Sequence, residues 1–327
     1  MFGLLPMHTP SSRLEFLPIS FFALVMGLTG LTLVWQRYAN LYDLPIGIVG
    51  HVLLMLSALA FISIASAYTL KYWRHPDRVR QEFAHPIKLS FFPAITISLI
   101  LLGTATVKLA PELSLLLWVS GAIGQLLFTL SILSAWLYQD KFQIQHSNPA
   151  WFIPVVGNIL VPIAGVQHVS PEISWFYFSI GLIFWLVLQT IIFYRMVFHP
   201  PLPEKLIPTL FILIAPPAVG FSAYLSLTGT LDPFARILFY SGLFIFLLLL
   251  FQVQRFWRLK FYLSWCAYSF PLAALTLATL GMYHQTQLAF FAMLGHLMVA
   301  MVSVVIGLLL LRTLQAMYRQ QICVAEE

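Results

Sequence analysis

The feature that most constrains this chain is a succession of long apolar runs that fills almost its whole length. About 20 consecutive apolar residues span a bilayer, and windows of that length predict ten membrane-spanning helices. Only 9% of the residues are charged, whereas a typical soluble domain has about 25%. The sequence therefore predicts an all-α integral membrane protein. Its ten spans are expected at about 16–36, 46–72, 90–109, 112–138, 151–168, 172–198, 208–228, 233–257, 261–282 and 286–317.

Basic residues are unevenly distributed between the two sides of these spans. The segment before the first span and the segments after the even-numbered spans hold 14 of the 17 Lys and Arg residues. The opposite side has only Arg37, Lys108 and Arg236. Because cytoplasmic loops of membrane proteins carry an excess of Lys and Arg, this asymmetry predicts that both termini are cytoplasmic.

The spans leave no room for a second folded domain. We expect a short cytoplasmic N-terminal lead at 1–15, a single ten-span transmembrane domain at 16–317 and a short cytoplasmic tail at 318–327. The sequence contains no HExxH, Walker loop or CxxC pattern, and each of these patterns would indicate a particular chemistry. We therefore expect no enzymatic activity, no cofactor and no metal site.

Prolines distinguish the odd-numbered spans from the even-numbered ones. An interior or near-entrance proline occurs in each odd span, and successive prolines are 75, 61, 62 and 55 residues apart. This spacing is typical of a repeated unit, here a helical hairpin with one proline-kinked helix and one straight helix. Isolated prolines are simply tolerated in membrane helices, but broken helices usually line a cavity or pathway. We therefore expect five hairpins around a central pore, with odd helices inside and even helices outside. The expected kinks are at Pro18, Pro93, Pro154, Pro216 and Pro271.

The polar residues of the odd spans indicate what such a pathway would carry. Asp and Glu lie at span ends or in loops rather than near the middle of a span, and cation pathways normally display intramembrane carboxylates. Hydroxyl and amide groups coordinate ions weakly, which suits passage rather than capture. A carbonyl freed by a proline would repel anions, so in an anion pore it should face other helices or water. The candidates for pore lining are Ser20, Thr29, Thr96, Thr104, Asn158, Ser222, Ser269 and Thr276.

Two histidines lie within even spans. His51 is near the predicted external end of the second span, and His296 is about 16 Å into the tenth at the usual helical rise. An ionisable group inside a membrane is a functional candidate. However, both lie on expected outer helices, and a neutral histidine bonded to a neighbouring helix costs little, so we favour a structural role over a functional one.

Several stretches together resemble one transporter family. These are FLPIS (16–20), HPIKLSFFPA (85–94), GQLLF (124–128), IAPPAVGFSAYLS (214–226), RILFYSGLFIFLLL (236–249) and the aromatic-Ser-Phe-Pro motif at 268–271. In this order they resemble the TehA/slow anion channel family, the tellurite-resistance and dicarboxylate transporter group. That group includes the plant guard-cell anion channels and the fungal malate permeases. The resemblance extends from Phe16 to about Arg312.

The resemblance implies a homotrimer in which each protomer has its own pore, lined by odd helices. It also implies that a phenylalanine of the ninth span plugs the pore, and the matching residue is Phe270. Pro271 would bend the helix and present this ring to the pathway. Bacterial members of the family carry Gly where Pro271 stands, whereas the plant channels have Pro, so the resting position of the ring is not implied.

The sequence and the resemblance together favour a passive anion channel of the inner membrane, gated by Phe270, for chloride and nitrate. The alternative is a proton-coupled carrier of C4-dicarboxylates, sulfite or tellurite, which needs a titratable group in the pathway. The expected partners are small inorganic anions, membrane lipid and two further copies of the chain, with no nucleic acid.

Overall fold

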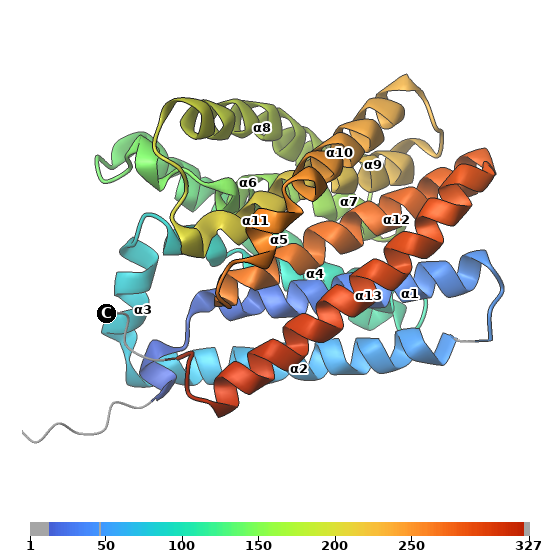
Figure 1. Cartoon of the computed structure of the whole chain (residues 1–327). Helices are drawn as coiled ribbons and strands as arrows, with labels where there is room; N and C mark the ends of the chain where they lie inside the picture. The colour runs from blue at the N-terminus through green and yellow to red at the C-terminus, as the bar shows by residue number, and fades with distance from the viewer. Residues whose placement is uncertain (1–12, 46, 324–327) are drawn as a thin grey trace, which may run out of the picture.

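The computed structural model describes residues 13–45 and 47–323, and within these ranges the chain forms only helices and their connections. The ten predicted spans are confirmed as helices long and apolar enough to cross a membrane. Both ends of the described chain lie at the same end of the bundle (Figure 1). Residues 1–12 of the predicted lead, residue 46 and residues 324–327 of the predicted tail lie outside the described residues. The spans are Ile19–Leu41, Gly47–Arg74, Lys88–Thr106, Pro111–Tyr138, Pro149–His168, Pro171–Phe198, Glu204–Thr228, Pro233–Phe251, Leu263–Thr286 and Ala289–Tyr318.

The odd spans are composite, and the even spans are single α-helices. Each odd span begins with 3-10 helix and continues as α-helix, and the fifth alternates between the two forms. The even spans are α2 (Gly47–Arg74), α5 (Pro111–Tyr138), α8 (Pro171–Phe198), α10 (Pro233–Phe251) and α13 (Ala289–Tyr318). The odd spans are η2 (Ile19–Phe21) with α1 (Phe22–Leu41); η3 (Lys88–Phe91) with α4 (Ala94–Thr106); η5 (Pro149–Trp151), α6 (Phe152–Val156), η6 (Gly157–Leu160) and α7 (Val161–His168); η7 (Glu204–Ile214) with α9 (Ala215–Thr228); and η8 (Leu263–Tyr268) with α12 (Ser269–Thr286).

The five prolines lie close to the changes between 3-10 and α-helix. Pro216 and Pro271 are in the first turns of α9 and α12, where the fixed φ of proline suits the helix. Pro18 and Pro93 directly precede η2 and α4, and Pro154 lies within the short α6. Each proline therefore accompanies a change of helix type instead of interrupting a long α-helix.

Burial divides the spans into two sets. In the most apolar window of each odd span, 67–89% of the residues are buried, against 11–39% in the even spans. The odd spans also contact one another in a closed ring, α1 to α4, α4 to α7, α7 to α9, α9 to α12 and α12 to α1. Each even span packs on the odd span before it and on the next odd span around the ring. The greater burial of the odd spans agrees with the prediction that odd helices lie inside and even helices outside.

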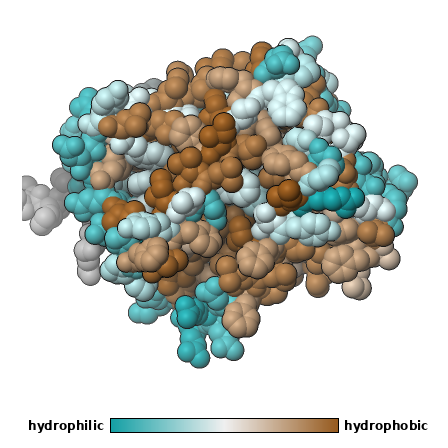
Figure 2. Space-filling view, turned by 90° about the horizontal axis from the view of Figure 1, so that it is seen from above, coloured by the Kyte–Doolittle hydropathy of each residue, from teal (hydrophilic) through white to brown (hydrophobic). Residues whose placement is uncertain are grey.

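The outer surface matches a membrane environment. Hydrophobic side chains form a broad area across the middle of one face, and hydrophilic ones gather mostly at its edges (Figure 2). Large apolar residues on the outer helices are well exposed, for example Leu127 at 59% and Leu297 at 65%. Since a bilayer solvates such side chains, their exposure carries no penalty there.

Two details of the loops differ from the predicted spans. The eighth span ends at Phe251 instead of 257, because the polar Gln252 ends the apolar run and a separate short helix, α11 (Val253–Trp257), follows. The loop after the second span contains a further helix, α3 (Pro76–Ala84), with buried Val79 and Glu82. The carboxylate of Glu82 accepts hydrogen bonds from Ile19 N–H at 2.8 Å, Tyr68 Oη at 2.9 Å and Lys71 Nζ at 2.8 Å. Helix α3 is thereby fixed to the start of the first span.

Candidate functional site

A cavity of about 570 Å³ lies within the ring of odd spans. Residues from all five odd spans line it, and α2 contributes Gly47 and His51. It includes the chain around the C-terminal ends of the odd spans, such as Asn40, Lys108 and Gln285, and reaches inward to Phe270. We call it the outer cavity, because it opens on the side opposite the chain termini.

The outer cavity is lined by cationic and neutral polar side chains. Arg37 and Lys108 contribute full positive charges, His51 and His284 contribute imidazoles, and no carboxylate is among the described residues that line it. Two of the three basic residues that the sequence assigns to this side therefore face one cavity. Because low-dielectric walls focus the field of such charges, the cavity favours anions over cations.

In the sequence, Arg37 and Lys108 stand out only as exceptions to the bias of basic residues toward the other side. Both residues follow the apolar part of an odd span, the first and the third. This shared position is the signal that could have identified them as lining residues.

A second, much smaller cavity of about 50 Å³ lies on the terminal side of Phe270. Its lining is mainly apolar and includes Met26, Ile153, Ile212 and Leu263. We call it the inner cavity. It offers no charged side chain among the described residues that line it, so an ion there would have little to replace its water.

Phe270 is the one described residue that lines both cavities. It is the second residue of α12, directly after η8 and before Pro271, and 9% of its surface is exposed. The change of helix type at this point places the ring between the cavities. The arrangement is an apolar constriction, which is one of the ways in which membrane pores are closed.

The predicted lining residues have different positions. Ser222 and Thr104 line the outer cavity. Ser269 is buried, donates to Cys266 O at 2.6 Å and lies so close to Gly27 of α1 that a Cβ there would overlap its side chain. Ser20 is half-buried in η2. Ser269 therefore serves the contact between α12 and α1.

Thr96 and Asn158 face the outer helix α5. The Thr96 hydroxyl donates to Pro93 O at 2.8 Å or Gln125 Oε1 at 2.7 Å, and Asn158 Nδ2 donates to Thr129 Oγ1 at 2.8 Å. Thr29 and Thr276 are buried and bonded to carbonyls of their own helices. The polar groups of Thr96 and Asn158 therefore link two helices, and those of Thr29 and Thr276 bond within their own helix.

Donors from α5 satisfy carbonyls at the irregular part of the fifth span. Gln125 Nε2 donates to Ile153 O and to Pro154 O, both at 3.1 Å, and Thr129 Oγ1 donates to Pro154 O at 2.7 Å. Trp118 Nε1 donates to Val161 O at 2.8 Å. These three carbonyls of the fifth span thus face a neighbouring helix.

The two histidines of the sequence analysis differ in position. His51 lines the outer cavity, and its Nδ1 is hydrogen-bonded to Gly47 O at 2.9 Å. His296 is 2.9 Å from Tyr38 Oη through Nδ1 and packs against Tyr42. His296 is not among the residues that line either cavity, so its contacts are those of a residue that joins two helices.

Comparison with known proteins gives consistent matches. Residues 17–314 match the voltage-dependent anion channel family. The chain is 28% identical to the tellurite resistance protein TehA homolog of Haemophilus influenzae, over 96% of this chain and 95% of that protein. It is 30% identical to an uncharacterized transporter of Methanocaldococcus jannaschii, over 80% of this chain and 81% of that one. It is also 28% identical to the S-type anion channel SLAH2 of Arabidopsis thaliana, over 80% of this chain, and spans about half of that protein (52%).

Proposed function

Because the chain belongs to the voltage-dependent anion channel family, we propose that it is a passive channel for small monovalent anions such as chloride and nitrate. Phe270 is its gate. The channel domain is 16–317, it lies in the inner membrane with both termini cytoplasmic, and three copies assemble with one pore each. The observation that carries this proposal is the position of Phe270, which alone among the described residues lines both the outer and the inner cavity.

The ring closes the pathway for a simple physical reason. An ion that passes an apolar ring must shed water, and complete transfer into a low-dielectric medium has an idealised cost on the order of 20 kcal/mol. A quarter of that cost reduces flux by roughly 10³ to 10⁴, because each step of about 1.4 kcal/mol is a factor of ten. One phenyl ring is therefore sufficient to shut the pore.

The outer cavity supports the preference for anions. Arg37 and Lys108 raise the local anion concentration. The hydroxyls of Thr104 and Ser222 donate to Ile100 O at 2.8 Å and to Ala218 O at 3.4 Å in their own helices, so these groups hold an anion only weakly, as passage requires. Preference among anions then follows ease of dehydration, because weak contacts replace little of the lost hydration. Nitrate should pass more easily than chloride.

A proton-coupled carrier is the second candidate. The relatives include one named for tellurite resistance and one named as a transporter, and His51 and His284 line the outer cavity. Both imidazoles lie at the open end of the pathway and the apolar inner cavity has none among its described lining residues. Among the described residues, no histidine therefore lines the pathway between Phe270 and the inner cavity, which favours the channel.

The proposal is tested by current–voltage curves in liposomes with asymmetric salt. Phe270→Ala should raise conductance by orders of magnitude and keep the reversal potential near that of the anion. Phe270→Leu should be intermediate, because it keeps apolar bulk without the ring. The comparison requires equal amounts of folded protein, because replacing a buried Phe with Ala lowers the free energy of unfolding of soluble proteins by about 3–5 kcal/mol. If well-folded Phe270→Ala conducts no better than the wild type, Phe270 is only a packing residue.

A further inference from the structure

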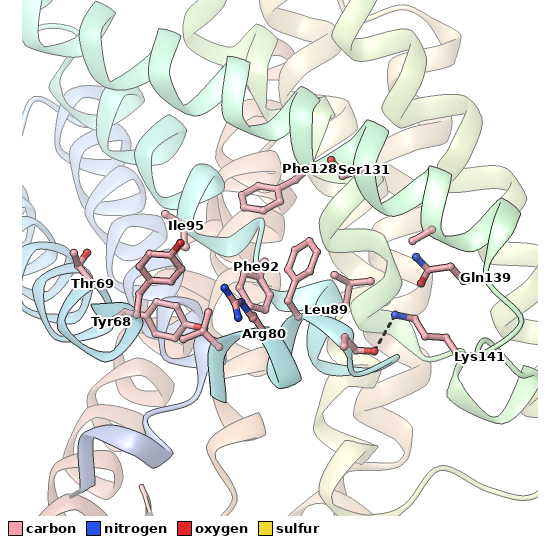
Figure 3. Close-up of a pocket in the computed structure, with 15 residues that line it drawn as sticks. Tyr68, Thr69, Arg80, Leu89, Phe92, Ile95, Phe128, Ser131, Gln139 and Lys141 are labelled. Carbon is pink, nitrogen blue, oxygen red and sulfur yellow. Dashed lines mark hydrogen bonds between the residues drawn. The ribbon is translucent and has the colours of Figure 1, made fainter. Parts of the chain in front are cut away.

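A third cavity, separate from the pathway, lies between α2, α3, the third span and α5. It is a groove of about 660 Å³, and none of its lining residues lines the outer or the inner cavity. Figure 3 shows side chains from these elements converging on it. The lining residues that matter below are Arg80, Phe83, Phe92, Phe128, Ala135 and Lys141.

The groove opens on the lipid-facing surface. Its walls are the outer helices α2 and α5, and exposed residues on them, such as Thr69 and Ser131, border it. Phe83 of α3 is 40% exposed and its ring lies 5.0 Å from that of Phe92, centroid to centroid. An exposed aromatic side chain on a short extramembrane helix is costly in water, and contact with acyl chains would remove that cost.

The groove extends from the end of α5 into the hydrocarbon region of a bilayer. Phe128 at its deep end is ten residues before Tyr138, the last residue of α5, which is about 15 Å at the α-helical rise. The 28 residues of α5 extend about 42 Å at that rise, so about 6 Å at each end lies outside a hydrocarbon core about 30 Å thick. The groove therefore reaches about 9 Å into the core, and the first part of an acyl chain that enters beside α3 would be in contact with protein.

The rim of the groove carries positive charge. Arg80 on α3 and Lys141 after α5 line it, and no carboxylate is among the described residues that do. Lys141 Nζ donates to Ala84 O at 2.9 Å, drawn as the dashed line in Figure 3, which leaves two of its protons for another acceptor. Arg80 Nη1 lies 3.4 Å from Asp77 Oδ1 and its side chain is 79% exposed, so most of its five donors are also available.

We propose that this groove binds one anionic phospholipid. The phosphate lies between Arg80 and Lys141, where a guanidinium and an ammonium group provide charge-assisted hydrogen bonds. One acyl chain lies along the groove over Phe92 and Phe128. Because the site shares no lining residue with the pathway, this assignment is independent of the proposed channel function.

Native mass spectrometry of the detergent-purified full chain tests this assignment. Phosphatidylglycerol and phosphatidylcholine with the same acyl chains are titrated separately. The wild type should retain one phosphatidylglycerol with at least tenfold preference over phosphatidylcholine. Arg80→Gln with Lys141→Gln should lower that preference by about tenfold, and Ala135→Trp, which fills the groove without changing charge, should abolish retention of both lipids.

Two controls make the result specific. Arg255→Gln with Arg258→Gln removes the same charge from exposed residues outside the groove and should leave retention unchanged. Inorganic phosphate at millimolar concentration should not displace the lipid, since the acyl chain supplies much of the binding. The proposal is overturned if the wild type retains no lipid, which would be the result if a second copy covered the groove. It is also overturned if phosphate alone displaces the lipid. The third contrary outcome is an equal loss of preference in the control pair and in the groove pair.

Discussion

The ring of Phe270 lies against Gly30 of the facing helix α1. A Cβ on Gly30 would lie 3.5 Å from Cδ2 of that ring and 2.9 Å from Cβ of Ala273, one turn further along α12. Because α1 and α12 are neighbours in the inner ring, the missing side chain at Gly30 lets the helices approach closely. The position of the proposed gate therefore depends on a glycine that precedes it by 240 residues in the sequence.

The first prediction follows from this contact. Gly30→Ala should lower the free energy of unfolding by about 1–3 kcal/mol, the usual cost of overpacking, because the new methyl group would be too close to Ala273. Adding Ala273→Gly should recover part of that loss. Conductance of Gly30→Ala should stay at the wild-type level, since the extra methyl group adds apolar bulk to the constriction.

Thermal unfolding in detergent and liposome conductance measure the two effects. Gly307→Ala is the matched control, because a Cβ on Gly307 meets nothing within 4 Å. Equal stability of Gly30→Ala and Gly307→Ala would show that the close contact between α1 and α12 is not constrained.

The second prediction concerns the charges of the outer cavity. In the Phe270→Ala background, Arg37→Gln and Lys108→Gln should each lower anion current at 0.01–0.1 M salt, where the Debye length is about 30–10 Å. At about 1 M salt, where it is about 3 Å, the difference should vanish. Arg236→Gln is the control, because this third basic residue of the same side does not line the cavity. A salt-independent loss, or an equal loss in Arg236→Gln, would contradict focusing by the cavity.

The sequence was sufficient to predict the spans and to distinguish odd from even ones, because each depends on a local signal. A 20-residue apolar run is visible without structure, and so is a proline in alternate spans. The direction in which a single polar side chain points could not be predicted in the same way. Thr96 and Asn158 were candidates for the pore lining, but their side chains bond to α5. The sequence does not show this direction, because a single polar residue in an apolar helix produces no amphipathic pattern.

Gln125 is the residue that could have indicated that these side chains face α5. It is a buried amide in a mainly apolar outer span, and a buried amide needs hydrogen-bond partners. The lipid-facing groove was inaccessible for another reason. It brings together α2, α3, α4 and α5, and the helix α3 that contributes Arg80 was not predicted.

The third prediction concerns this amide. Gln125→Leu keeps a similar volume but removes the donors to Ile153 O and Pro154 O. An unsatisfied buried polar group costs about 1–3 kcal/mol, so thermal stability should fall clearly. Ser120→Ala is the control on the same helix, because the exposed Ser120 donates only to Leu116 O of its own helix. An unchanged unfolding temperature for Gln125→Leu would contradict the expected cost of leaving these two carbonyls without the amide donor.

The fourth prediction concerns topology. A cysteine at Asp77, whose side chain is 80% exposed, should resist an impermeant thiol reagent in intact cells, because α3 is cytoplasmic in the orientation proposed from the basic-residue bias. Asn40→Cys in the outer cavity should react. Asn40 is a better probe than Asp43, whose φ of 48° disfavours most side chains. The background lacks Cys323, and labelling of permeabilised cells controls for accessibility. The reverse pattern of labelling would invert the proposed orientation.

The last prediction separates the channel from the carrier. Anion flux should follow the electrochemical gradient of the anion alone, so a pH gradient imposed on liposomes at zero membrane potential should drive no uphill accumulation. The reason is the position of the imidazoles. His51 and His284 line the outer cavity, as do Arg37 and Lys108, and the described lining of the inner cavity is mainly apolar and has no histidine. Accumulation against the anion gradient would establish a carrier instead. In that case His51→Gln or His284→Gln should abolish coupling, whereas His296→Gln should not, because His296 bonds to Tyr38 and lines neither cavity.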